Sequence, residues 1–142
     1  MRASEVRAAI AAAITALSAE SPAGEGDRFV YVATLSRDPD TAPGRSFRLA
    51  LATQPQRADL TTDDAWIVEY QLSVFYPASP DVEDRIGADA ELIDIALERL
   101  HETNASINNV TCEPAGVDEI GVALLASRLS VVALFRQSEA IL

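Results

Sequence analysis

Apolar residues recur every three or four positions near the start of the chain. This spacing places them on one face of a helix and predicts a helix over residues 4–19, with Ser4 as its N-cap. Glu5 suits the first turn, because the N-terminal end of a helix carries partial positive charge. The residues on the expected buried face are Val6, Ile10, Ile14 and Leu17.

A second helical pattern begins in the middle of the chain. Ser79 is expected to cap this helix with Pro80 at its first position, and the pattern continues to about His101 or Thr103. Gly87 weakens the helix locally, so a break at this position stays open. The expected buried face consists of Ile86, Ala90, Ile93, Leu97 and Leu100.

Apolar and polar residues alternate in two short segments between the predicted helices. Residues 28–35 are apolar on both faces, which is typical of a strand covered on both sides, whereas residues 45–52 have one polar face. Residues 37–44, between them, are rich in turn formers, so we expect an antiparallel hairpin with a long tip. The inward residues of its second strand are Phe47, Leu49 and Leu51.

Alternation is strongest over residues 65–76 and returns over residues 120–136. Twelve residues at ~3.3 Å each span about 40 Å, whereas a globule of 15.2 kDa is only about 30 Å across. Either such strands extend past the core and need another chain to cover them, or a bulge splits each one. Residues 106–113 predict a short strand that ends in a turn over residues 114–118, and residues 54–64 predict a polar connection.

The predicted elements follow the order α-β-β-β-α-β-β. Strands dominate, and the two amphipathic helices are enough to cover one face of a sheet. The sequence therefore predicts a single α+β domain over residues 1–142. Its antiparallel or mixed sheet has about five strands, with both helices packed on one face.

The charge balance is strongly acidic. The chain has 22 Asp and Glu residues against 11 basic residues, all of them Arg, and a formal net charge of −11. This balance argues against sequence-independent binding to nucleic acid or to anionic lipid. No segment approaches the ~20 apolar residues of a membrane span, and the start lacks a signal-peptide pattern, so we expect a protein of the cytoplasm.

The sequence gives little support for catalysis. The absence of Lys excludes a Schiff-base lysine and a phosphate-loop lysine. Cys112 is the only cysteine and is expected to be buried and inert. His101 is the only histidine, and its neighbour Glu102 points to a different face of the helix. We therefore expect no enzyme, no metal site and no cofactor.

Acidic residues concentrate in the second predicted helix. Between Pro80 and Thr103, eight carboxylates stand against two arginines, which gives a net charge of −6. Four of them fall within an ~80° stripe that is either a solvated outer face or a surface that repels a polyanion or meets an Arg-rich partner. Leu92 and Ile95 beside it are either a small contact patch or the edge of the core. The stripe consists of Glu91, Asp94, Glu98 and Glu102.

Three segments carry a resemblance to a known family. Residues 2–17 form an amphipathic opening helix that contains Arg and Ala. Residues 66–77 read WIVEYQLSVFYP and precede a helix that contains AELIDIAL at residues 90–97, and the chain closes on ASRLSVVALF at residues 126–135. Together with the order of elements, this pattern resembles the tail terminator, or tail completion, proteins of long-tailed bacteriophages and phage-tail-like particles.

The resemblance implies a structural role. Proteins of this family form homo-hexameric rings on the last ring of the tail tube protein, stop tube growth and offer a surface to the head connector or neck protein. Double-stranded DNA later passes through their channel without tight binding. The implied location is the virion tail, and the host cytoplasm during assembly, with no membrane partner. A head–tail neck or adaptor protein and a small ligand-binding module remain as alternatives.

An acidic ring suits the passage of DNA, because a channel that bound phosphates would retain it. We hypothesise that part of the negative charge faces the channel, either the acidic stripe on the helix or the loop acids Asp38, Asp40, Asp63 and Asp64. The hairpin tip and the connection over residues 54–64 are either contact elements or plain surface loops. The candidates for contact with a partner or with the next subunit are Arg37, Asp38, Asp40, Arg45, Arg57, Asp63, Asp64, Arg128 and Arg136.

Overall fold

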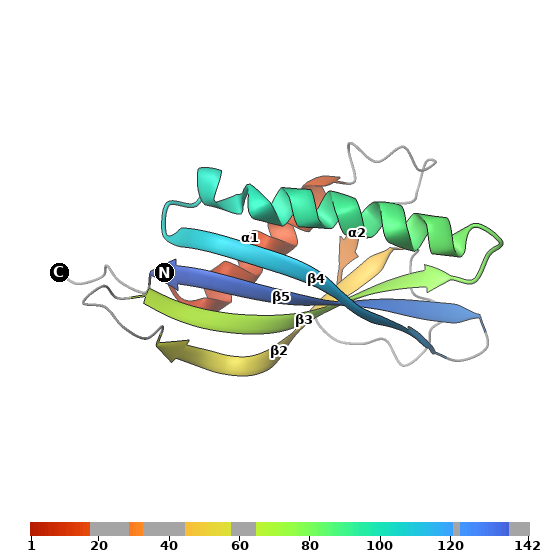
Figure 1. Cartoon of the computed structure of the whole chain (residues 1–142), viewed down its shortest axis with the longest axis horizontal. Helices are drawn as coiled ribbons and strands as arrows, with labels where there is room; N and C mark the ends of the chain where they lie inside the picture. The colour runs from red at the N-terminus through yellow and green to blue at the C-terminus, as the bar shows by residue number, and fades with distance from the viewer. Residues whose placement is uncertain (18–28, 33–44, 58–64, 121–122, 137–142) are drawn as a thin grey trace.

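The computed structural model describes residues 1–17, 29–32, 45–57, 65–120 and 123–136. The helices and strands follow the predicted order, with a short 3-10 turn after the second helix (Figure 1). The elements are α1 (Ala3–Ala16), β1 (Val30–Tyr31), β2 (Ser46–Arg57), β3 (Ala65–Pro77), α2 (Val82–Glu98), η3 (Leu100–Glu102), β4 (Ile107–Glu119) and β5 (Leu124–Arg136).

The five strands form one sheet in the order β1-β2-β3-β5-β4. β1 is parallel to β2, and the other neighbouring pairs are antiparallel. Both helices pack on the same face of the sheet (Figure 1). The predicted α+β fold, with a mixed five-stranded sheet and two helices on one face, is confirmed.

The predicted antiparallel hairpin between residues 28–35 and 45–52 is wrong. β1 runs parallel to β2, and the Val30 amide donates to the Arg45 carbonyl oxygen at 3.2 Å. A parallel pair requires a connection of about a dozen residues or more, and residues 32–45 meet that length. A hairpin loop has only about two to five residues, and the connection exceeds that length because β1 ends at Tyr31.

β3 and β5 form the centre of the sheet and pair along their entire lengths. Each has 13 residues, and the register runs without a shift from Ala65 opposite Arg136 to Pro77 opposite Leu124. The prediction of two long strands is confirmed, although β5 begins at Leu124 rather than at residue 120. A bulge that splits each of them is wrong, because the register shifts lie in the outer strands β2 and β4.

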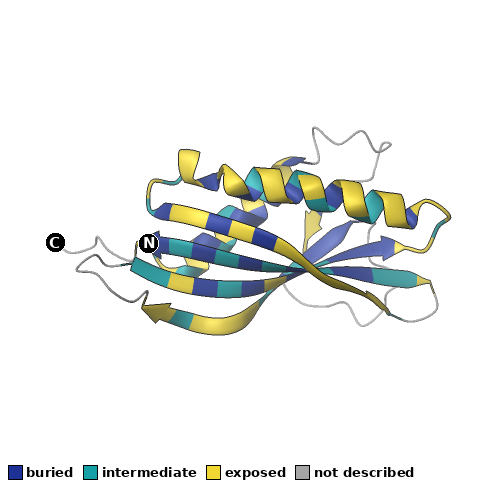
Figure 2. Ribbon diagram, viewed as in Figure 1, coloured by how far each residue is buried: buried dark blue, intermediate teal, exposed yellow. Residues whose placement is uncertain are grey.

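The hydrophobic core lies between the sheet and the two helices. Buried and more exposed positions alternate along β3 and β5, as Figure 2 shows. Tyr70 ties α1 to the sheet, because its hydroxyl donates to the Ala3 carbonyl oxygen at 2.9 Å. Complete burial of one large apolar side chain contributes about 1.5–3 kcal/mol. The largest fully buried side chains are Tyr70, Tyr76, Phe29, Phe47, Phe135, Ile10, Ile14, Leu72, Ile93, Leu97, Ile107 and Leu129.

The helix starts differ from the prediction. The Arg2 amide, just before α1, donates to the Glu5 carboxylate at 3.2 Å, so Ser4 lies inside the helix and is not its cap. This geometry satisfies one of the backbone donors that a helix start leaves without an intrahelical partner.

α2 begins two residues later than expected. Asp81 precedes its first residue, and the Ser79 hydroxyl donates to the Asp81 carboxylate at 2.7 Å instead of capping the helix. Gly87 does not break α2, and apart from its chain neighbours and the backbone of the helix itself, no atom lies within 4 Å of the place where a Cβ would stand. The predicted end near His101 is confirmed, because η3 continues to Glu102.

Candidate functional site

Residues 51–57 of β2, the β2 extension, continue past the core. Leu51, predicted to point inward, is 46% exposed, and six of the seven residues of the extension are exposed. The predicted connection from residue 54 is wrong as far as Arg57, because the strand continues to that residue. The polar run around Pro55 resembles a loop in sequence, but an edge strand tolerates polar residues on both faces and a proline.

Residues 113–119 of β4, the β4 extension, also continue past the core, at the opposite edge of the sheet (Figure 1). All seven residues are exposed, and Val117 is 52% exposed. The predicted turn over residues 114–118 is wrong, because the strand continues through Pro114 and Gly116 with a register shift between them. Proline is tolerated at an edge bulge, and the φ of 136° at Gly116 favours glycine.

Arg128 of β5 lies against the β4 extension. Its Nε atom is 2.7 Å from Oδ2 of Asp118, and a Cβ at Gly116 would stand 2.7 Å from its Nη2 atom. The glycine therefore leaves room for the guanidinium. An ion pair this exposed contributes at most about 1 kcal/mol. A contact of Arg128 with another subunit stays a prediction.

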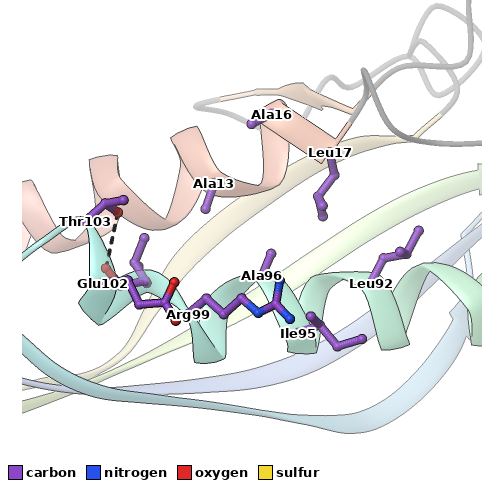
Figure 3. Close-up of a pocket in the computed structure, with 10 residues that line it drawn as sticks. Ala13, Ala16, Leu17, Leu92, Ile95, Ala96, Arg99, Glu102 and Thr103 are labelled. Carbon is purple, nitrogen blue, oxygen red and sulfur yellow. Dashed lines mark hydrogen bonds between the residues drawn. The ribbon is translucent and has the colours of Figure 1, made fainter.

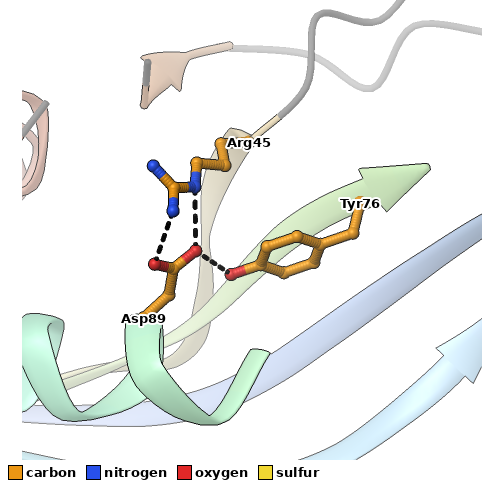
Figure 4. Close-up of polar contacts among 3 residues, drawn as sticks. All are labelled: Arg45, Tyr76 and Asp89. Carbon is orange, nitrogen blue, oxygen red and sulfur yellow. Dashed lines mark hydrogen bonds and ion pairs between the residues drawn. The ribbon is translucent and has the colours of Figure 1, made fainter. Parts of the chain in front are cut away.

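Arg45, another predicted contact residue, is not on the surface. It is 3% exposed, and its Nε and Nη2 atoms each lie 3.0 Å from the Asp89 carboxylate. The Tyr76 hydroxyl donates to the same carboxylate at 2.8 Å. Figure 4 shows how this cluster joins the start of β2, the end of β3 and the first half of α2. The expectation that Arg45 meets a partner at the surface is therefore wrong.

Burial dominates the electrostatics of this cluster. It raises the pKa of Tyr76 well above its ordinary value, and the neighbouring Asp89 charge raises it further. Burial also raises the pKa of Asp89, while the hydrogen bond from Tyr76 and the Arg45 charge oppose that rise. Arg45 has a φ of 61°, a backbone conformation that this anchoring holds in place. The cluster is a structural tie between three elements.

Sequence reasoning missed Asp89, although the signal was present. Asp89 lies four residues before Ile93 and eight before Leu97, so it falls on the predicted buried face of the helix. The charge of Asp89 suggests a surface residue, whereas its position on the helix indicates burial. A carboxylate on a core face indicates a buried cationic or hydroxyl partner.

The four acidic residues of the predicted stripe are exposed, but they line different surfaces. Asp94 and Glu98 line a groove of about 320 Å³ between α2 and β4, to which β4 contributes Glu113. Glu102 lines a second groove instead. Cys112 also lines the first groove, and burial, together with the Asp94 and Glu113 charges, raises the pKa of its thiol to about 12. Cys112 is therefore buried and protonated at neutral pH.

The second groove, of about 430 Å³, lies between α1 and the end of α2 (Figure 3). Its lining is mostly apolar, with contributions from Leu17 and Ala96. Leu92 packs against the core, whereas Ile95 is 48% exposed. Of the two readings offered by the sequence, the edge of the core fits Leu92 and a contact patch fits Ile95.

The remaining predicted contact residues divide into two groups. Arg57 and Arg136 are exposed at the same end of the sheet, where they lie opposite Trp66 and Ala65 of β3. The residues that lie outside the described part of the chain are Arg37, Asp38, Asp40, Asp63 and Asp64.

Among the described residues, no three His, Cys, Asp or Glu side chains gather in a way that could hold a metal ion. None of the helices in the described part of the chain is long and apolar enough to cross a membrane.

Comparison with known proteins gives a fold and no family. Neither family models nor curated protein sequences match this chain. A solved structure of a protein known only by a sequence identifier is similar, with a TM-score of 0.53 and 12% sequence identity, over 98% of this chain and 99% of the other. At this identity the similarity shows the shared fold alone.

Proposed function

We propose that this chain is a structural virion protein that caps a phage tail tube as a ring. The ring ends tube polymerisation, presents a surface to the head connector and lets double-stranded DNA pass through its channel. The observation that carries the proposal is the pair of strand extensions at opposite edges of the sheet. The core of the subunit leaves both extensions exposed, and two different exposed surfaces on one subunit suit the head-to-tail contacts of a ring.

The tail tube is selected from other ring assemblies by the sequence resemblance. The order of elements and the segments at residues 2–17, 66–97 and 126–135 support this choice. The described architecture agrees with that order along the chain.

The proposal also gives the negative charge a role. A ring built from chains of net charge −11 repels phosphates and so does not retain the DNA that passes through it. The exposed acids of α2 and η3 remain the described candidates for the channel wall: Glu91, Asp94, Glu98 and Glu102. Reversal of Glu91 and Glu98 to Arg is expected to slow DNA ejection, measured by dye release from purified virions.

Deletion of the gene from the phage or prophage that carries it tests the function. Tail tubes are expected to lose their uniform length and to stay separate from heads in electron micrographs. The purified protein is expected to show a species near six times 15.2 kDa at high concentration, measured by light scattering. Tubes of normal length joined to heads would contradict the proposal. Gold-labelled protein in the neck, away from the tube end, would indicate a neck or adaptor protein instead.

One observation favours a second candidate, a ligand-binding module. The groove between α1 and α2 has a volume of about 430 Å³ and a mostly apolar lining, and small-molecule sites measure about 300–1,000 Å³. This candidate predicts that an apolar fluorescent probe binds the native protein and that Ile95→Glu abolishes its binding. A probe that binds both proteins equally would exclude it.

A further inference from the structure

Each extension carries one of the most exposed large apolar side chains among the described residues. Leu51 in the β2 extension and Val117 in the β4 extension are 46% and 52% exposed. Among the described large hydrophobic residues only Ile95, at 48%, is similarly exposed. Each extension therefore presents one aliphatic side chain that the fold does not bury.

The extensions also carry opposite charge. The β4 extension contains three carboxylates, of which Asp118 pairs with Arg128, while Glu113 and Glu119 form no ion pair within the described residues. The β2 extension contains Arg57, whose guanidinium likewise forms no ion pair there. Arg binds carboxylates through a planar fork of N–H donors, so these surfaces are complementary.

The backbone of both extensions resists simple strand addition. Pro55 and Pro114 each remove one N–H donor, and the register of both strands shifts close to these residues. Prolines and bulges are devices that keep edge strands from pairing through their backbones. A contact between these edges must therefore depend on side chains.

We propose that the β2 extension of one copy docks against the β4 extension of the next copy. Leu51 packs on Val117, and Arg57, six residues further along β2, pairs with Glu113, four residues before Val117 on β4. This inference rests on the ring proposed above and names the surfaces that join its subunits. Because the two extensions lie at opposite edges of the sheet, the contact repeats head to tail, and it forms a ring where the rotation from one copy to the next closes.

The contact is small, and this has a consequence for assembly. Each extension has seven residues, whereas a stable interface uses about 20–30 residues on each side. A pair of copies is therefore weakly bound, and closure of the ring or binding to the tube stabilises all contacts together. Dimers and trimers are expected to be scarce when complete rings form.

Cysteine cross-linking tests the contact even if it is weak. In a Cys112→Ser background, Leu51→Cys together with Val117→Cys is expected to give a ladder of disulfide-linked multimers on mild oxidation. The matched control combines Ile95→Cys with Val117→Cys, because Ile95 is equally exposed but lies on α2. The control is expected to form at most a disulfide-linked dimer. Absence of the ladder, or an equal ladder in the control, would overturn the inference.

Charge exchange tests the pairing of Arg57. Two variants of the cross-linking protein are compared. One carries Arg57→Glu, and the other carries Glu113→Arg together with Glu119→Arg. Each variant on its own is expected to lower the ladder yield at least tenfold. An equimolar mixture of the two variants is expected to restore it, because each reversed surface then meets its complement. Glu83→Arg, an exposed reversal on α2, is the control and is expected to change nothing. Full yield from either reversed variant alone would contradict the pairing.

The outcomes separate this inference from the proposed function. A ladder from a protein whose deletion leaves tails normal would support the contact and contradict the tail role. Disordered tail length after deletion, without any ladder, would support the tail role and overturn the contact. Cross-links from Leu51→Cys to the tube protein in assembling tails, in place of a second copy, would also overturn the contact.

Discussion

The two central strands of the sheet, β3 and β5, and the strands that flank them, β2 and β4, have nearly equal lengths but different surroundings. β3 and β5 pair through 13 residues without a register shift, and their core-facing positions are buried except near one end of each strand, where Trp66 and Leu125 are partly buried. β2 and β4, of 12 and 13 residues, are buried only in their first halves and contain register shifts. The helices therefore decide which part of a strand belongs to the core. The exposed halves of β2 and β4 are extended strands that bury no core, so the stability of the subunit does not explain why they are there.

The largest effect on stability is expected at the buried ion pair between Arg45 and Asp89. Asp89→Ala removes the partner of a buried Arg45 and is expected to lower the free energy of unfolding by about 3–5 kcal/mol, measured by urea denaturation. Asp94→Ala, an exposed acid on the same helix, is the control, with an expected change below about 0.5 kcal/mol. Equal stability of the two variants would contradict a structural role for the cluster.

The next largest effect is expected at Cys112, which lies at the boundary between the buried and exposed halves of β4. It is the last buried residue before the β4 extension. Burial, with the Asp94 and Glu113 charges, raises the pKa of its thiol from 9.0 to about 12 in the folded state. The thiol is therefore expected to react with a disulfide reagent at pH 8 far more slowly than in urea, since only the thiolate reacts.

The same shift has a consequence for stability. An unfolded thiol ionises above about pH 9 while the folded thiol stays neutral, so the unfolded state is favoured as pH rises. The contribution of Cys112 is complete below pH 9 and is lost between pH 9 and about 12. Cys112→Ala is expected to show a shallower decline in urea stability over that range. A fast native reaction at pH 8 would place the thiol outside the core.

A smaller effect is expected inside the β4 extension itself. Gly116→Ala places a side chain at a φ of 136° and a Cβ near the Arg128 guanidinium, which costs about 1–3 kcal/mol. The loss is expected to be local, because the extension makes no part of the core. Faster hydrogen exchange at residues 117–119, with unchanged exchange in β3, is the expected readout. The matched control is Ala115→Ser, and equal exchange in both variants would contradict the conclusion.

The smallest effect on stability is expected at Val117, in the exposed half of β4. Val117→Ser is expected to change the free energy of unfolding by less than about 0.5 kcal/mol, because the side chain is 52% exposed. Val110→Ser, on the buried half of the same strand, is the matched contrast and is expected to cost at least about 2 kcal/mol. Similar losses in both variants would erase the distinction between the two halves of β4.

The parts of the fold that were predicted correctly are those that the core dictates. The alternation over residues 65–76 and the helical face containing Ile93 reflect burial against the core, and both predictions are confirmed. The extensions were misread because an exposed edge strand has no apolar face, so Pro55 and Pro114 looked like turn residues. The pattern of apolar and polar residues does not reveal a strand that is held extended only by pairing with the neighbouring strand.

The candidate site was predictable only in outline. Long strands do reach past the core, but their exposed ends lie in β2 and β4 and not in the two strands with the strongest alternation. Arg45 was taken for a surface residue because its partner Asp89 is 44 positions away, a pairing that no local spacing shows. Conversely, Ile95 was recognised from its place beside the main apolar face of the helix.

The unbroken pairing of β3 with β5 also determines how a subunit carries mechanical load. The backbone hydrogen bonds between antiparallel strands lie perpendicular to the strand direction. A pull along the central strands therefore strains the bonds of all 13 paired positions at once, in shear, instead of opening them one after another. The outer strands, with their shifted registers, lack such a continuous ladder. Under tension along the strands, the centre of the sheet resists and the edges yield first.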